Sequence, residues 1–258
     1  MASRRLVRAK RIFEGRHALG VAVGACGVAF GLGALIRYSF LQAVDLSVTR
    51  LLQREEWPPL DTAMVGFTNA GDPIVVPVLG GVAALALQQM ALPRAARLVL
   101  MSLGSVPANI VMKNFWDRAR PDRKLVNVAV ETAGTSFPSG HTMGATALYG
   151  SLAALAWIHM DPRTIRLPLT LILVAIPIGV GISRVYLGAH WLSDVVAGYA
   201  LGLFVLVPVV RHYLKGIPAE VEKEAATKGA PHETTGEVAA ALGPTITNGP
   251  LALNPSPS

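Results

Sequence analysis

Long apolar segments alternate with polar connections along the first 216 residues of the chain. Each segment is close to the ~20 residues that an α-helix needs to cross a bilayer, and nothing in the pattern resembles a strand ladder. Small residues recur within the segments, as in GVAVGACGVAFGLGA and GYALGLF, and favour close helix packing in lipid. The pattern predicts an all-α, multi-pass membrane protein, a six-transmembrane-helix bundle with spans at roughly 18–36, 74–92, 95–112, 142–158, 167–182 and 192–210.

Residues 44–57 show a different pattern, with apolar and polar side chains on opposite faces of a helix. The apolar face carries Val44, Val48, Leu51 and Leu52. The polar face carries Asp45, Arg50, Arg54 and Glu55. We expect an interfacial helix that is ended by Pro58-Pro59. The stretch FTNAGDP, residues 67–73, has turn chemistry just before the second span and is either part of the site entrance or a plain turn.

The two ends of the chain differ from the bundle, which we place at 18–216. Residues 1–17 are basic, and a basic segment before an apolar run is typical of a cytoplasmic flank. The first apolar run is longer than the core of a signal peptide, so we expect it to be retained. Residues 217–258 are rich in Ala, Thr, Pro and Gly without a periodic core, which predicts a disordered cytoplasmic tail with no catalytic role.

Composition supports the membrane assignment and limits the possible partners. The chain is 52% hydrophobic and 15% charged, whereas a soluble domain has about 25% charged residues. The net charge of +7 is concentrated at the N-terminal flank rather than in a binding surface, so we expect a bilayer partner and no nucleic acid. The sole cysteine, Cys26, cannot form an intramolecular disulfide.

The connections between the spans predict the orientation. With the N-terminus in the cytoplasm, the inner connections carry Arg94, Arg97, Arg163, Arg166, Arg211 and Lys215, as the positive-inside rule requires. The outer connections break that rule, because they carry Lys113, Arg118, Arg120, Arg123, Lys124 and Arg184. A requirement other than membrane topology must therefore keep these cations on the outer face.

The stretch SRVYLGAHWLSD, residues 183–194, places ionisable groups between the last two spans. His190 and Asp194 are four residues apart, so on a helix they share one face. The carboxylate can then accept the Nδ1 proton of His190 and leave Nε2 as a nucleophile. Arg184 is close enough to reach an anion above the imidazole. The alternative is a His–Asp pair that merely links two helices.

Two further stretches, KNFWDRARP at 113–121 and FPSGHT at 137–142, flank the connection before the fourth span. Lys113 and Arg120 offer a point charge and a bidentate fork for phosphate oxygens, although snorkelling basic residues are the alternative. Ser139 and Gly140 precede a helix start and can form an amide cradle for an anion, although Ser139 is equally suited to an ordinary N-cap. His141 at its rim can protonate a departing oxygen.

Together the three stretches resemble the type 2 phosphatidic acid phosphatase (PAP2) superfamily over roughly residues 40–212. The matching residues are Lys113 with Arg120-Pro121, then Pro138-Ser139-Gly140-His141, then Ser183-Arg184 with His190 and Asp194. The resemblance implies a phosphohistidine at His190, oriented by Asp194, with His141 as the acid and later the base. It assigns phosphate binding to Lys113, Arg120, Arg184, the Ser139 hydroxyl and the Gly140 amide. It also implies a site on the outer face that uses no metal and no cofactor.

We therefore expect a phosphatase of the cell (inner) membrane that hydrolyses a lipid phosphomonoester or diphosphate. The leading substrates by this resemblance are a polyprenyl diphosphate such as undecaprenyl diphosphate, phosphatidic acid and phosphatidylglycerol phosphate, with lipid A as an alternative. A non-catalytic lipid-phosphate binder or transporter is the alternative from a different class. Vanadium-dependent haloperoxidases share the motifs but are largely soluble, which the six apolar spans disfavour.

Overall fold

The computed structural model describes residues 2–54 and 57–217, and within these ranges all regular secondary structure is helical. Apart from residue 217, the predicted disordered tail lies outside the described residues. In chain order the helices are α1 (Ala2–Glu14), α2 (Arg16–Leu35), α3 (Ser39–Leu52), α4 (Pro58–Ala70), α5 (Val75–Gln89), α6 (Pro93–Ser102), α7 (Ser105–Lys113), α8 (Gly140–His159), α9 (Arg163–Tyr186) and α10 (Leu192–Lys215).

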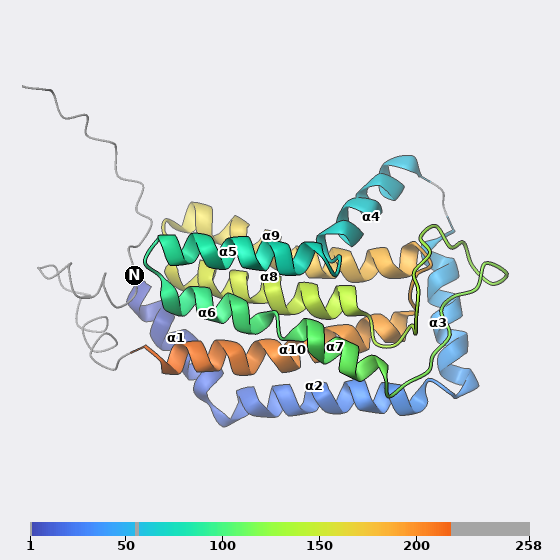
Figure 1. Cartoon of the computed structure of the whole chain (residues 1–258), viewed down its shortest axis with the longest axis horizontal. Helices are drawn as coiled ribbons and strands as arrows, with labels where there is room; N and C mark the ends of the chain where they lie inside the picture. The colour runs from blue at the N-terminus through green and yellow to red at the C-terminus, as the bar shows by residue number, and fades with distance from the viewer. Residues whose placement is uncertain (1, 55–56, 218–258) are drawn as a thin grey trace, which may run out of the picture.

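The long helices form one bundle around α8. In Figure 1, α2, α5, α6, α8, α9 and α10 run along the long axis of the molecule. Helix α8 is buried along most of its length and packs against α9 and α10. A Cβ at Gly198 of α10 would lie 2.7 Å from the carbonyl oxygen of Ser139, so glycine permits α10 to approach the start of α8. This is the close packing that the small residues predicted.

Length and composition make this a membrane-spanning protein. Within the described residues, four helical segments are long and apolar enough to cross a bilayer: α2, α6 with α7, α9 and α10. Helices α4 and α5 form a fifth if this pair, bent by 59°, counts as one span. Large apolar side chains such as Val23, Val78 and Leu171 point outward from the bundle, as they do on a surface that faces lipid. The remaining predicted span, 142–158, corresponds to α8, which its neighbours enclose.

The helix boundaries differ from the predicted segments in three places. The segment at 95–112 is divided into α6 and α7 at Leu103 and Gly104. The predicted interfacial helix begins and ends earlier, as α3, and residues 55–56 of the predicted range lie outside the described residues. Pro58 does not end that helix but begins α4, because a helix needs no N–H donor in its first turn.

The predicted polar face of α3 is wrong at Asp45. This carboxylate is only 1% exposed, whereas Leu51, predicted on the apolar face, is 67% exposed. Helix α3 therefore turns Asp45 toward the protein and an apolar side chain outward. In Figure 1, α3 stands across one end of the bundle, beside the connection between α7 and α8.

The basic N-terminal segment packs against the opposite end of the bundle as α1. Arg5 forms an ion pair with Asp161 at 2.7 Å. Arg211 donates hydrogen bonds to the carbonyl oxygens of Phe13 and Glu14 at 2.9 and 2.5 Å. The segment is thus part of the fold, and not only a charged flank.

Candidate active site

The three polar stretches meet at the end of the bundle that α3 covers. Lys113 ends α7, Gly140 and His141 begin α8, and Arg184 lies in the last turn of α9. Helices α8 and α10 bring these ends together, since the backbone N–H of Ser139 donates to the carbonyl oxygen of Asp194 at 3.0 Å. The structure therefore places all eight predicted site residues in one region.

His190 and Asp194 form a pair, but not on one helix face as the spacing predicted. His190 lies in the link before α10, and Asp194 lies in the first turn of α10. Their Nδ1 and Oδ2 atoms are 3.4 Å apart. The same oxygen accepts the backbone N–H of Trp191 at 2.9 Å and the Ser136 hydroxyl. The hydrogen bond from the backbone N–H of Trp191, the N-cap residue of α10, fixes the Asp194 carboxylate at the start of the helix. This places the carboxylate next to the imidazole of His190.

Arg120 identifies the tautomer of His190. Its Nη1 lies 3.1 Å from Nε2 of the imidazole, and since a guanidinium only donates hydrogen bonds, Nε2 is the acceptor. The ring proton then sits on Nδ1, facing Asp194. Burial lowers the pKa of His190 to about 4, although Asp194 acts in the opposite direction. The imidazole is thus neutral at physiological pH, with the lone pair of Nε2 directed into the site.

The three predicted phosphate-binding cations differ in how their donors are used. Lys113 Nζ donates to the carbonyl oxygen of Thr135 at 2.5 Å. Arg120 donates to carbonyl oxygens of the same connection and to that of Ala189. Arg184, which is 1% exposed, donates through Nη1 to Thr68 Oγ1 at 2.6 Å. Its Nε and Nη2 have no hydrogen-bond partner within the described part of the chain. Arg184 therefore has buried donors that an anion could satisfy.

Thr68 also decides the role of the FTNAGDP stretch, which was open between a plain turn and a part of the site. The threonine lies near the end of α4 and is buried. Because its hydroxyl accepts the Arg184 hydrogen bond, the stretch helps to place the guanidinium.

The first turn of α8 is the place where we predicted an amide cradle for an anion. Ser139 occupies the N-cap position, but its side chain caps no helix N–H and instead accepts a hydrogen bond from Thr142 Oγ1 at 3.0 Å. The ordinary capping alternative is therefore wrong for its hydroxyl. A Cβ at Gly140 would lie 2.7 Å from Asn109 Oδ1, which explains the glycine. The N–H groups of this first turn have no acceptor within the helix.

His141 lies among the other titratable side chains of the site. Its electrostatic neighbours are Arg184, His190, Arg120 and Lys113. This position is suited to proton transfer at an oxygen held by the same cations. Within the described residues, no three His, Cys, Asp or Glu side chains lie close enough to hold a metal ion.

Comparison with known proteins identifies the family. Residues 94–217 match the model of the PAP2 superfamily. Phosphatidylglycerophosphatase B of Bacillus subtilis is 32% identical over 181 residues, which cover 67% of this chain and 84% of that protein. The chain belongs to the PAP2 superfamily. Its members hydrolyse phosphate esters, and this chain is a PAP2-type phosphatase.

Two further comparisons extend this result. Decaprenylphosphoryl-5-phosphoribose phosphatase of Mycobacterium tuberculosis is 37% identical over 121 residues, which cover 45% of this chain and 62% of that protein. The crystal structure of a transmembrane PAP2-type phosphatidylglycerolphosphate phosphatase from Bacillus subtilis is similar with a TM-score of 0.63. It is 28% identical, and the match covers 73% of this chain and 93% of that one.

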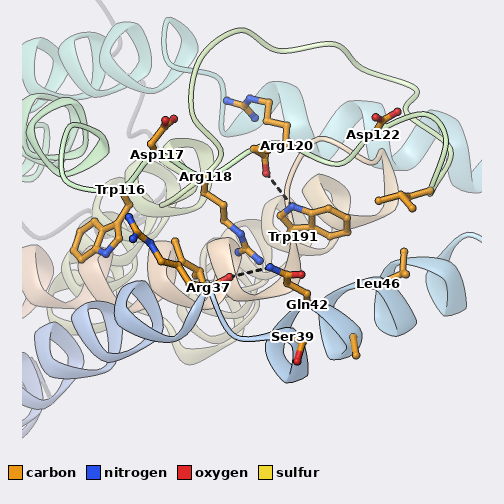
Figure 2. A pocket seen from close by; sticks show the side chains of 14 residues that line it. Arg37, Ser39, Gln42, Leu46, Trp116, Asp117, Arg118, Arg120, Asp122 and Trp191 are labelled. Carbon is orange, nitrogen blue, oxygen red and sulfur yellow. Dashed lines mark hydrogen bonds between the residues drawn. The ribbon is translucent and has the colours of Figure 1, made fainter.

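A cavity of about 630 Å³ adjoins the PAP2 site. It lies between α3 and the connection that carries Arg118 and Arg120, as Figure 2 shows. Trp191, the neighbour of His190, forms part of its wall and donates to the carbonyl oxygen of Ala119 at 3.1 Å. The cavity offers mixed polar and apolar surface next to Arg120.

Sequence reasoning missed several buried polar residues that contact the site. These are Asp45, Thr68, Arg118, Ser136 and Ser193. The sequence did offer a signal for Arg118, because Arg118 is one of the cations on the outer connections that the positive-inside rule disfavours. No sequence signal pointed to Ser136, and Asp45 was predicted to lie on the polar face of its helix.

Proposed function

We propose that this protein is an integral membrane phosphatase that hydrolyses a lipid phosphomonoester or diphosphate through a phosphohistidine intermediate. The observation that carries the proposal is the arrangement at His190. Nε2 carries the lone pair and faces Arg120, a carboxylate supports Nδ1, and a buried arginine beside them has two nitrogens without a hydrogen-bond partner within the described residues. These are the parts of a nucleophilic phosphoryl transfer.

In the proposed reaction, Nε2 of His190 attacks phosphorus and the bond to the lipid oxygen breaks. His141 gives its proton to that oxygen, so a neutral alcohol or a monophosphate leaves. His141 then takes a proton from water, which attacks phosphorus and breaks the P–N bond to release inorganic phosphate. Asp194 stabilises the positive charge that the imidazole carries while it is phosphorylated.

The phosphate oxygens are held by Arg184, Arg120 and Lys113, together with the Ser139 hydroxyl and the Gly140 amide. Arg184 binds first in this proposal, because its Nε and Nη2 have no acceptor within the described residues. Arg120 and Lys113 exchange their carbonyl partners for phosphate oxygens, which are stronger acceptors because they are charged. No step requires a metal or a cofactor.

We place the protein in the cell (inner) membrane with six spans, counting α8 as a span enclosed by the others. Both termini are then cytoplasmic, and the site lies at the outer face. Labelling at the exposed positions Lys124 and Arg163 tests this orientation. In a Cys26→Ser background, Lys124→Cys is expected to react with a membrane-impermeant maleimide on intact cells, and Arg163→Cys only after lysis. The opposite pattern would reverse the orientation without affecting the chemistry.

The substrates to test are lipids that carry a terminal phosphate. The names of the relatives favour phosphatidylglycerol phosphate and a polyprenyl-linked phosphate, beside undecaprenyl diphosphate, phosphatidic acid and lipid A. Phosphate release by the purified protein in detergent is expected for at least one of these lipids, and not by the folded His190→Ala variant. Phosphate binding without turnover across the panel would instead favour a lipid-phosphate binder.

A further inference from the structure

A second arginine of the same connection, Arg118, joins the interfacial helix to the site. Its guanidinium is buried and lies between two carboxylates. Nη2 donates to Asp45 Oδ2 at 2.6 Å, and Nη1 donates to Asp194 Oδ1 at 2.5 Å. Figure 2 shows the Arg118 side chain running from the connection toward α3. The roles that we assigned to residues of the three sequence motifs include neither Arg118 nor Asp45.

Ser193 completes this cluster from the first turn of α10. Its backbone N–H and its hydroxyl donate to the two oxygens of Asp45, at 2.9 and 2.7 Å. The same hydroxyl accepts a hydrogen bond from Arg118 at 2.6 Å. Both carboxylate oxygens of Asp45 thus accept hydrogen bonds, and Asp45 contacts Ser193, the residue next to Asp194. A carboxylate on α3 is in this way fixed to the start of α10.

Arg118 acts on Asp194 from two sides. Directly, it holds Oδ1, and this leaves Oδ2 pointing at the imidazole of His190. Indirectly, its carbonyl oxygen accepts the backbone N–H of Ser136 at 2.8 Å, and the Ser136 hydroxyl donates to Asp194 Oδ2. The position of the carboxylate that supports the nucleophile therefore depends on Arg118.

The charges explain why a second carboxylate is present. If Arg118 were paired with Asp194 alone, its charge would neutralise that carboxylate and weaken its support for a cationic imidazole. Because Asp45 shares the guanidinium, the three groups together retain one negative charge. That charge is available to His190 when phosphorylation makes its ring positive. Burying three charges costs desolvation energy that a purely structural contact does not require.

We propose that Asp45 and Arg118 are positioning residues, which orient Asp194 and preserve its negative charge toward His190. The inference rests on the proposed role of His190 as the nucleophile. It also assigns α3 a part in the reaction, since Asp45 reaches the network only when α3 is docked on the bundle.

Asp45→Asn tests the proposal, because it removes the charge and keeps the shape. We expect kcat to fall by about 10- to 100-fold, the usual effect of removing a supporting hydrogen-bond partner. KM and the inhibition constant of inorganic phosphate are expected to stay within about twofold, because Arg184, Arg120 and Lys113 are untouched. Thr49→Val is the matched control: Thr49 lies one turn along the same buried face of α3, and its hydroxyl donates to the backbone carbonyl oxygen of Asp45 and not to the carboxylate. It is expected to retain kcat.

Arg118→Lys is the second variant, for the case that Asp45→Asn does not fold. It keeps the charge but lacks the fork that reaches both carboxylates, and a similar loss of kcat at unchanged phosphate inhibition is expected. Wild-type kcat in either folded variant would overturn the positioning role. So would equal losses in Asp45→Asn and Thr49→Val with equal falls in thermal stability. Activity in His190→Ala would instead overturn the proposed function itself.

Discussion

Arg184 offers a direct test of how the site recognises phosphate. The side chain is buried and charged, and two of its nitrogens make no hydrogen bond to the described residues. Such a group lowers the stability of the phosphate-free protein, because its donors have lost water without gaining acceptors. A bound phosphate restores those hydrogen bonds. Replacing Arg184 by Met is therefore expected to raise stability and to lower activity.

The size of both effects follows from the hydrogen bonds. A hydrogen bond to a charged group contributes roughly 1.5–3 kcal/mol, so the two donors contribute about 3–6 kcal/mol to the bound phosphate. Since each 1.4 kcal/mol is about tenfold in rate, kcat/KM of Arg184→Met is expected to fall by at least about 100-fold. Removing the unpaired charge is expected to stabilise the phosphate-free protein by on the order of 1–3 kcal/mol.

The assay combines steady-state kinetics with thermal unfolding in detergent, with and without inorganic phosphate. The Tm of the wild type is expected to rise with phosphate, because a ligand that binds the folded state stabilises it, and that of Arg184→Met is not. Arg211→Met is the control. Its guanidinium donates to three carbonyl oxygens at the far end of the bundle, so the variant is expected to lose stability and keep kcat/KM.

Two results would refute this reasoning. If Arg184→Met lowers Tm and activity together, the arginine serves the fold through Thr68 and not the phosphate. If kcat/KM stays within about twofold of the wild type, the free donors do not bind the substrate at all.

Three further predictions concern the chemistry at the nucleophile. His190→Ala is expected to abolish turnover while the protein stays folded in detergent, and appreciable remaining activity would exclude it as the nucleophile. Activity is expected to survive a strong chelator, and a loss that added metal restores would identify a required ion. Because burial lowers the pKa of His190 to about 4, below its ordinary ~6.5, the unfolded chain binds the proton first as the pH falls. Stability is then expected to decline from about pH 6.5 to 4, less steeply in His190→Asn; equal slopes in thermal unfolding would contradict this.

The long helices and the catalytic motifs could be predicted from sequence because their signals are local. Every predicted apolar segment overlaps a helix of the structure, since the length of an apolar run alone indicates a helix in lipid. The site motifs are short and rigidly spaced, and each lies where a helix begins or ends. Folding the bundle then brings His190, Arg184 and Lys113 to one end.

The supporting residues could not be predicted because their signals depend on distant partners. Asp45 sits on an amphipathic helix whose polar side would normally face water. It is buried only because Arg118, 73 residues further along the chain, meets it there. The break between α6 and α7 differs, because a local signal marks it: Pro107 has no N–H to donate to the carbonyl oxygen of Leu103, and Gly104 lies at the break.

Four of the six cations of the outer connections, Lys113, Arg118, Arg120 and Arg184, no longer conflict with the positive-inside rule once their surroundings are known. In the proposed topology, Arg118 is held by two buried carboxylates, whereas Lys113 and Arg120 are held by backbone carbonyl oxygens. Among these four, only Arg184 has buried side-chain nitrogens without any hydrogen-bond partner within the described residues. The rule concerns charges in flexible connections near lipid, and these charges are instead fixed inside the protein. The proposed mechanism therefore predicts an order, in which phosphate first meets Arg184 and then displaces the weaker carbonyl acceptors from Arg120 and Lys113.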